Sequence, residues 1–177
     1  MLNFEFCSPT KFVFGRDTQQ KVGQLVKEFG GSRVLVVYGG GSVVRSGLLD
    51  RVKASLEAEG IAYVELGGVV PNPRVSKVYE GVELCKKEGV DFVLAVGGGS
   101  TIDCSKAIAV GAKTDKDFWE AFYLNWEDAE DAIPLGTILT IPATGSEMDK
   151  DAVVTNWATG EKNSYANDKM YPRFSIL

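Results

Sequence analysis

Histidine is absent from this sequence of 177 residues, and that absence limits the chemistry its side chains can perform. Within these residues no imidazole can act as a general base or bind a metal ion. Three cysteines are present, Cys7, Cys85 and Cys104, and they are widely spaced and form no C-x-x-C pair. Their odd number and their spacing favour reduced, packed thiols over a disulfide framework or a zinc site.

Long apolar runs and an excess of positive charge are also missing. No run approaches the roughly 18 apolar residues of a membrane helix, and the opening letters MLNFEFCSPTK lack the basic and apolar regions of a signal peptide. We therefore expect a cytoplasmic protein without a membrane partner. The net charge of -5 argues against nucleic acid as the main partner, because proteins that bind nucleic acid usually carry a basic surface.

Two kinds of apolar pattern alternate along the chain. Short continuous runs at 33–38, 61–66, 90–96 and from 135 predict buried parallel strands, and strand-like segments also occur at 4–7, 12–15 and 174–177. Helical spacing predicts helices at 18–29, 43–59, 75–88 and from the second glycine cluster to about 111. This alternation predicts an α/β fold with a doubly wound, Rossmann-like parallel sheet.

The segment from 114 to 134 differs in composition from the rest of the chain, because it is acidic and carries two tryptophans. Its pattern predicts an amphipathic helix in which Trp119, Phe122 and Tyr123 are packed and the carboxylates are solvated. Clustered carboxylates without histidine are weak evidence for a metal site.

The tetrapeptide GGGS occurs twice, at 39–42 and at 97–100, each time between a predicted strand and a predicted helix. In a doubly wound sheet, ligands bind beyond the carboxyl ends of the strands, where helix N-termini also point. Glycine permits positive φ and close approach of a ligand, while free N–H groups and the helix dipole favour an anion. We expect a phosphate to bind there.

A second interpretation treats both clusters as tight strand-to-helix turns without a ligand. The dinucleotide fingerprint G-x-G-x-x-G is not met, because Val44 and Ile102 occupy the third glycine position. Ser100 and Asp103 resemble a capping box, which is compatible with binding. Since a carboxylate repels a phosphate, Asp103 is expected to face a ribose or the nicotinamide.

Several stretches together resemble the iron-containing alcohol dehydrogenases, especially their butanol dehydrogenase-like branch. The matching pieces, in order, are VLVVYGGGSV, the segment from PNPRVSKVYE to GGGSTIDCSKAIA, LTIPATGSEMDKDAVVTN with the following GEK, and MYPRFSIL. The resemblance covers essentially the whole chain. It implies that residues 1–177 are an N-terminal dinucleotide-binding domain like that of dehydroquinate synthase. A helical domain holding a metal on one aspartate and three histidines is expected beyond Leu177.

The resemblance also implies roles for individual residues. The first cluster would lie at the adenosine end of the cofactor and Asn72 near the adenine ribose. Backbone N–H groups of the second cluster would hold the pyrophosphate, with Asp103 toward the nicotinamide and Lys162 reaching a ribose. Two threonines would line the adenine and phosphate flank. The full expected set is Gly39, Gly40, Gly41, Ser42, Asn72, Gly98, Gly99, Ser100, Asp103, Thr140, Thr144 and Lys162. Ordinary turn or strand-end roles remain open for Asn72, Thr140 and Lys162.

The choice of cofactor depends on the residue after the first buried strand. Family members that favour NAD carry an acidic residue there, whereas this sequence has Gly39, and Ser42 could donate to a phosphate. NADP(H) is therefore favoured over NAD(H). The implied reaction is hydride transfer between the nicotinamide and a small alcohol or aldehyde, with iron or zinc as the Lewis acid in the full-length protein only. A homodimer with the N-terminal strand at the contact is also implied.

Two other functions remain open. The chain could be a stand-alone module that binds a nucleotide without turnover. It could also be a relative of glycerol dehydrogenase or dehydroquinate synthase, although PATGSEM and YGGGS favour the alcohol branch.

Overall fold

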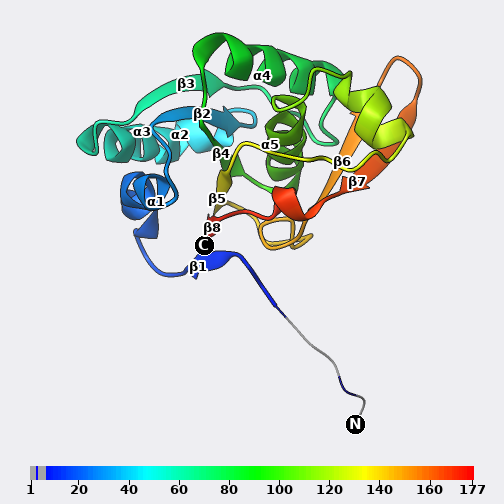
Figure 1. Ribbon diagram of the computed structural model, residues 1–177. Helices are drawn as coiled ribbons and strands as arrows, with labels where there is room; N and C mark the ends of the chain where they lie inside the picture. The colour runs from blue at the N-terminus through cyan, green and yellow to red at the C-terminus, as the bar shows by residue number, and fades with distance from the viewer. Residues whose placement is uncertain (1–2, 4–6) are drawn as a thin grey trace.

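The computed structural model describes residues 3 and 7–177 and shows a parallel sheet flanked by helices (Figure 1). The sheet has six strands in the order β1-β8-β5-β4-β2-β3, and every neighbouring pair is parallel. The strands are β1 (Lys11–Val13), β2 (Arg33–Tyr38), β3 (Ala62–Leu66), β4 (Phe92–Gly97), β5 (Leu135–Leu139) and β8 (Phe174–Ile176). The predicted α/β fold is confirmed. The strand expected at 4–7 falls mainly outside the described residues.

Helices cover both faces of the sheet, which explains why its central strands are continuously apolar. In β2, Val34 and Val36 join one hydrophobic cluster while Leu35 and Val37 join the other, as the two-residue period of a strand requires. The first cluster includes side chains of α1 (Val22–Glu28), α2 (Ser42–Arg45) and α3 (Leu48–Ala58). The second includes side chains of α4 (Val75–Glu88) and α5 (Gly99–Gly111). None of the helices in the described part of the chain is long and apolar enough to cross a membrane.

Two predicted helices differ in detail from the observed ones. The helix at 18–29 begins as the 3₁₀ turn Thr18–Lys21, and the helix at 43–59 is interrupted between α2 and α3. Gly47 has a φ of 69° at this break, a left-handed conformation that glycine adopts without strain. Hydrophobic periodicity missed the break because the apolar side chains of both short helices pack into the same hydrophobic cluster.

The long amphipathic helix predicted at 114–134 is wrong. Only one π-helical turn, Trp119–Leu124, forms there. Its aromatic side chains are buried as expected, and Trp119 stacks on Tyr123 with ring centroids 5.2 Å apart. Phe122 stacks on Tyr165 at 5.1 Å, so contacts with a distant strand, rather than helical periodicity, determine this segment.

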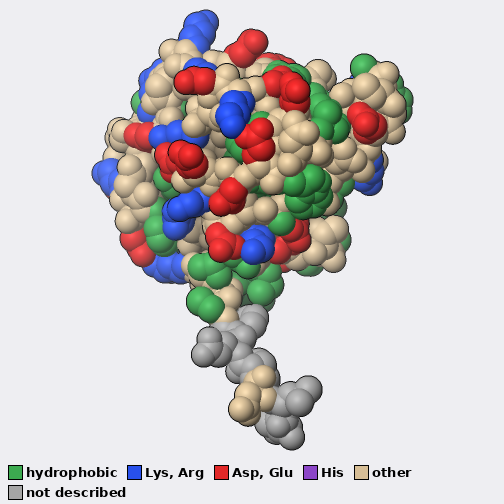
Figure 2. Space-filling model, turned by 45° about the vertical axis from the view of Figure 1, so that its right-hand side comes forward, with side chains coloured by type: hydrophobic (Ala, Val, Ile, Leu, Met, Phe, Trp, Pro, Cys, Tyr) green, Lys and Arg blue, Asp and Glu red, His purple; other side chains and the backbone are tan. Residues whose placement is uncertain are grey.

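A two-stranded hairpin lies beside the parallel sheet and packs against α5 (Figure 1). Its antiparallel strands are β6 (Asp151–Asn156) and β7 (Glu161–Ala166), and a 3₁₀ turn, Asp168–Met170, follows. The backbone N–H of Thr155 donates to the carbonyl of Pro73 at 2.8 Å, which connects the hairpin to the turn before α4. On the face seen in Figure 2, acidic and basic side chains are interspersed.

Candidate functional site

The two GGGS clusters lie next to each other at the carboxyl edge of the sheet. The first follows β2 and the second spans the end of β4, and these strands are hydrogen-bonded neighbours with Tyr38 opposite Val96. The chain adds β3 on one side of β2 and then β4 and β5 on the other, so its direction across the sheet reverses between β2 and β4. This reversal is the topological switch point at which doubly wound sheets bind ligands.

The glycines of these clusters do not adopt positive φ. The expectation that they are glycine because the backbone needs positive φ there is therefore wrong. Two of them are required by packing, because an added Cβ would lie 2.5 Å from Thr101 Oγ1 at Gly97 and 2.8 Å from Thr144 Oγ1 at Gly99. By contrast, a Cβ at Gly40 would meet no atom within 4 Å, and at Gly98 only Ile141 at 4.0 Å. Neither φ nor packing demands glycine at these two positions, which leaves bare backbone open to a ligand.

A pocket of about 200 Å³ lies at the N-terminus of α5. It gathers residues that are far apart in the sequence, and its lining consists of Asn72, Pro73, Gly99, Ser100, Asp103, Thr144, Val153 and Lys162. Six of these belong to the set expected from the resemblance. The cluster at 39–42, Gly98 and Thr140 are not part of its lining, although the N–H of Thr140 donates to the carbonyl of Gly97 at 3.0 Å.

A chain of hydrogen bonds connects three residues that line the pocket. Lys162 Nζ donates to Asn72 Oδ1 at 2.8 Å, and the backbone N–H of Asn72 donates to Ser100 Oγ at 3.3 Å. Asn72 has a φ of 56°, a left-handed conformation that asparagine tolerates better than most residues. The three side chains thus connect β7, the turn before α4 and the start of α5 around one opening.

The start of α5 offers backbone donors to the pocket. Gly98 is the N-cap residue, and no side chain caps the helix. The first N–H groups of a helix lack intrahelical acceptors, so those of Gly99 and Ser100 are available to an anion, and the helix dipole favours negative charge there. The capping box proposed for Ser100 and Asp103 is therefore not formed.

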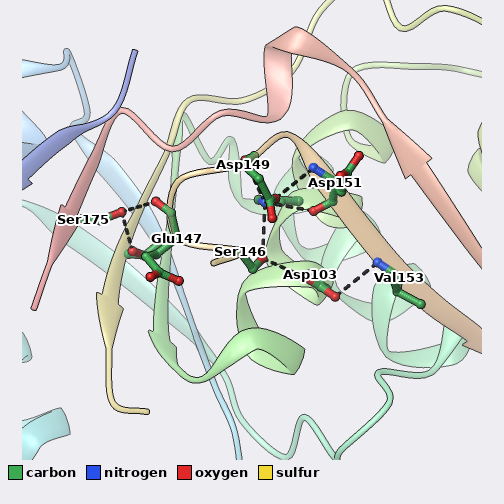
Figure 3. Close-up of polar contacts among 9 residues, drawn as sticks. Asp103, Ser146, Glu147, Asp149, Asp151, Val153 and Ser175 are labelled. Carbon is green, nitrogen blue, oxygen red and sulfur yellow. Dashed lines mark hydrogen bonds and ion pairs between the residues drawn. The ribbon is translucent and has the colours of Figure 1, made fainter. Parts of the chain in front are cut away.

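Asp103 instead makes tertiary contacts with its carboxylate (Figure 3). Its Oδ1 accepts from Ser146 Oγ at 2.6 Å and its Oδ2 accepts from the backbone N–H of Val153 at 3.2 Å. Burial raises the pKa of Asp103, although both hydrogen bonds and the nearby charge of Lys106 oppose that rise. The carboxylate lies at the pocket with both oxygens engaged.

Sequence reasoning missed Lys106, which is completely buried and contacts Ser146, the partner of Asp103. Its Nζ donates to Ser146 Oγ at 3.2 Å, to Asp149 Oδ1 at 2.6 Å, and to the carbonyls of Asp149 and Asp151 at 2.9 Å each (Figure 3). Burial lowers the pKa of Lys106, and the contact with Asp149 opposes this. The available signal was the D-x-x-K spacing, which places Lys106 one helical turn after Asp103 on the same face.

The parallel sheet, its switch point and the pocket at a helix N-terminus define a Rossmann-like α/β domain. The sequence profile of the family described as iron-containing alcohol dehydrogenase matches residues 9–177. The chain belongs to the iron-containing alcohol dehydrogenase family.

Individual relatives agree with this assignment. The probable NADH-dependent butanol dehydrogenase 2 of Bacillus subtilis is 52% identical over 177 residues, covering 100% of this chain and 45% of the relative. The NADPH-dependent aldehyde reductase YqhD of Escherichia coli is 37% identical over 179 residues, again covering 100% and 45%. The crystal structure of NADH-dependent butanol dehydrogenase A from Thermotoga maritima matches with a TM-score of 0.94 and 49% identity, over 98% of this chain and 44% of that one. The chain thus spans somewhat less than half the length of these relatives.

Proposed function

We propose that residues 1–177 form the dinucleotide-binding part of an NAD(P)-dependent alcohol or aldehyde oxidoreductase. One observation carries the proposal: the pocket at the switch point brings together Asn72, Ser100 and Lys162 beside the N-terminus of a 13-residue helix. Backbone donors, a helix dipole and an exposed ammonium group favour a phosphate-containing ligand. The names of the relatives support a dinucleotide and a small alcohol or aldehyde as its substrates.

The proposed binding mode follows from this geometry. The N–H groups of Gly98, Gly99 and Ser100 would hold the pyrophosphate, and the open surface at Gly98 admits it closely. Lys162 and Asn72 would contact a ribose, with Thr140 and Thr144 along the flank. The cluster Gly39–Ser42, on the other side of the switch point, would receive the adenosine end.

The chemistry proposed is hydride transfer between the nicotinamide C4 and the alcohol or aldehyde carbon, which the cofactor itself supplies when bound. This chain would bind and orient the cofactor. Among residues 3 and 7–177, no three or more His, Cys, Asp or Glu side chains lie together so that they could hold a metal ion. The iron or zinc expected for the full-length enzyme does not fit the side chains of these residues.

For the choice of cofactor we favour NADP(H). The turn after β2 carries no acidic residue, and Arg45 places a cation there, because an added Cβ at Gly41 would lie 2.4 Å from its Nη1. A guanidinium can bind a 2′-phosphate with two parallel hydrogen bonds. Arg45 thus joins Gly39 and Ser42 as a residue that would select the cofactor. NAD(H) is the competing candidate, since the Bacillus subtilis relative is named NADH-dependent.

The test is a fluorescence titration of the full-length protein with NADPH and with NADH. We expect tighter binding of NADPH, and in Arg45→Ala a loss of about tenfold in NADPH affinity with NADH unchanged, the effect of removing one charged contact of about 1.4 kcal/mol. Arg16→Ala is the matched control, because this exposed arginine follows β1, and three strands lie between β1 and β2. Tighter binding of NADH would overturn the cofactor preference alone, whereas binding of neither would overturn the proposed function.

An activity assay of the 177-residue chain beside the full-length protein separates turnover from binding. We propose that the 177-residue chain binds the cofactor but does not oxidise alcohols when iron or zinc is added. Alcohol oxidation by this chain alone would contradict that proposal, and an inactive full-length protein would instead favour a binding module.

A homodimer is proposed with its contact near β1, which lies at one edge of the described sheet and is followed by Phe14 with 85% of its surface exposed. The cytoplasmic location expected from the sequence stays a prediction.

A further inference from the structure

Asp103 lines the pocket, yet its carboxylate is committed to the protein. One oxygen accepts from Ser146 Oγ and the other from the backbone N–H of Val153, the third residue of β6. Each carboxylate oxygen can accept a further hydrogen bond, but the two bonds that are formed fix the orientation of the carboxylate and connect it to Ser146 and β6. These contacts give Asp103 a structural role beside the pocket.

The bond to Val153 connects α5 to the strand pair that carries Lys162. In the β6–β7 register, Thr155 lies opposite Lys162, two residues beyond Val153 along the strand. Lys162 then reaches across the pocket to Asn72 Oδ1 at 2.8 Å. A shift of β6 at Val153 would thus be transmitted to the ammonium group that closes the pocket.

Lys106 and Ser146 reinforce this connection through further hydrogen bonds. Ser146 Oγ donates to Asp103 and accepts from Lys106 Nζ, so its hydroxyl hydrogen is directed to the carboxylate. Lys106 also binds the carbonyl of Asp151, the first residue of β6. The start of the hairpin is therefore held to α5 at two points, Asp151 and Val153.

We propose that Asp103 is a positioning residue: together with Ser146 and Lys106 it fixes the β6–β7 hairpin, and through it places Lys162 over the pyrophosphate and ribose, instead of contacting the nicotinamide. This inference rests on the proposed function. It replaces the expectation that Asp103 faces the nicotinamide end of the cofactor. It also implies that Asp103 affects the binding of the ADP-ribose part of the cofactor and not that of the nicotinamide ring.

The experiment compares two probes by calorimetric titration of the full-length protein: NADPH, and 2′-phospho-ADP-ribose, which has no nicotinamide. In Asp103→Asn, one carboxylate oxygen is replaced by an NH₂ group that cannot accept a hydrogen bond. The hydrogen bond from Ser146 or from Val153 is therefore lost. We expect both probes to lose affinity by a similar factor of about tenfold, the effect of roughly one charged hydrogen bond. If the NADPH affinity falls while 2′-phospho-ADP-ribose binds as before, Asp103 contacts the nicotinamide and the inference is wrong.

A double-mutant cycle with Lys162→Met tests the route of the effect. Because Asp103 acts through Lys162, Asp103→Asn should cost less than about twofold in the Lys162→Met background. Full additivity of the two losses would contradict the inference. Asp117→Asn is the matched control, since Asp117 also accepts from a backbone N–H, that of Glu120 at 2.8 Å, but lies outside the pocket.

A Ser146 variant and the unmodified protein are titrated with the same probes. Ser146→Ala removes the hydroxyl that donates to Asp103 Oδ1 and accepts from Lys106 Nζ. It should lower the affinity for both probes equally, and an unchanged affinity would count against the proposal. If the unmodified protein binds neither these probes nor NADH and ADP-ribose, the proposed function fails. Normal binding without any effect of these variants refutes the positioning role alone.

Discussion

Replacing Lys106 with methionine tests whether the buried ammonium group stabilises the fold. The side chain is completely buried, and its Nζ lies within 3.2 Å of four acceptors, the hydroxyl of Ser146, one carboxylate oxygen of Asp149 and two carbonyls. A hydrogen bond to a charged group contributes about 1.5–3 kcal/mol, so three N–H donors contribute roughly 4–9 kcal/mol before desolvation is counted. Desolvation of an ammonium group costs several kcal/mol, and Asp149, being 38% exposed, is still solvated after the change.

The difference leaves an expected loss of about 3 kcal/mol in the free energy of unfolding for Lys106→Met. Urea denaturation followed by tryptophan fluorescence and far-UV circular dichroism measures it. Lys150→Met is the matched control, because Lys150 lies 2.7 Å from Asp168 in an ion pair of similar length whose partners are 43% and 78% exposed. An exposed pair contributes little. A loss in Lys106→Met no larger than that in Lys150→Met would refute the reasoning.

Two further predictions concern reactivity and pH. Burial raises the pKa of Cys85 and of Cys104 to about 12, so at pH 8 we expect a thiol reagent to label the exposed Cys7 in the folded protein and the other two only after unfolding, as mapped by mass spectrometry. Rapid labelling of a buried thiol would contradict this. Burial raises the pKa of Asp91, but hydrogen bonds from Ser32 and backbone N–H groups outweigh that and hold it below the ordinary 3.8. Its contribution is therefore present above pH 3.8 and is lost as the pH falls through the lower, folded-state value. The stability difference between wild type and Asp91→Asn, roughly 1 kcal/mol at neutral pH, should shrink on acidification, and a difference independent of pH would show that the charge is not involved.

The sequence predicted much of the site because several of its residues lie at strand ends or helix starts. A glycine cluster after a buried parallel strand necessarily lies at the carboxyl edge of the sheet, which is why Gly99 and Ser100 fall at the pocket. Asn72 and Lys162 were identified only through the family resemblance, since 90 residues separate them and no local pattern brings them together. The binding roles of these residues stay predictions, although Asn72, Ser100 and Lys162 line one pocket.

Other features could not be predicted because they depend on contacts between distant segments. Asp103 and Ser100 match a capping box locally, yet the carboxylate turns to Ser146 and Val153, which become neighbours only when the hairpin packs on α5. Lys106 would be solvated on an isolated helix, and only the acceptors of the segment 146–151 make its burial tolerable.

The sequence by itself determined the α/β alternation, the central strands and the edge at which the glycine clusters lie. Apolar periodicity reflects which faces are buried, and burial on both faces of a parallel sheet produces the continuous runs seen at 33–38 and 92–97. The tertiary structure alone decided the helix break at Gly47, the single helical turn at Trp119–Leu124, the conformation of the glycines and the partners of Asp103. These outcomes arise from packing and hydrogen bonding between segments far apart in the chain, which a local pattern does not encode.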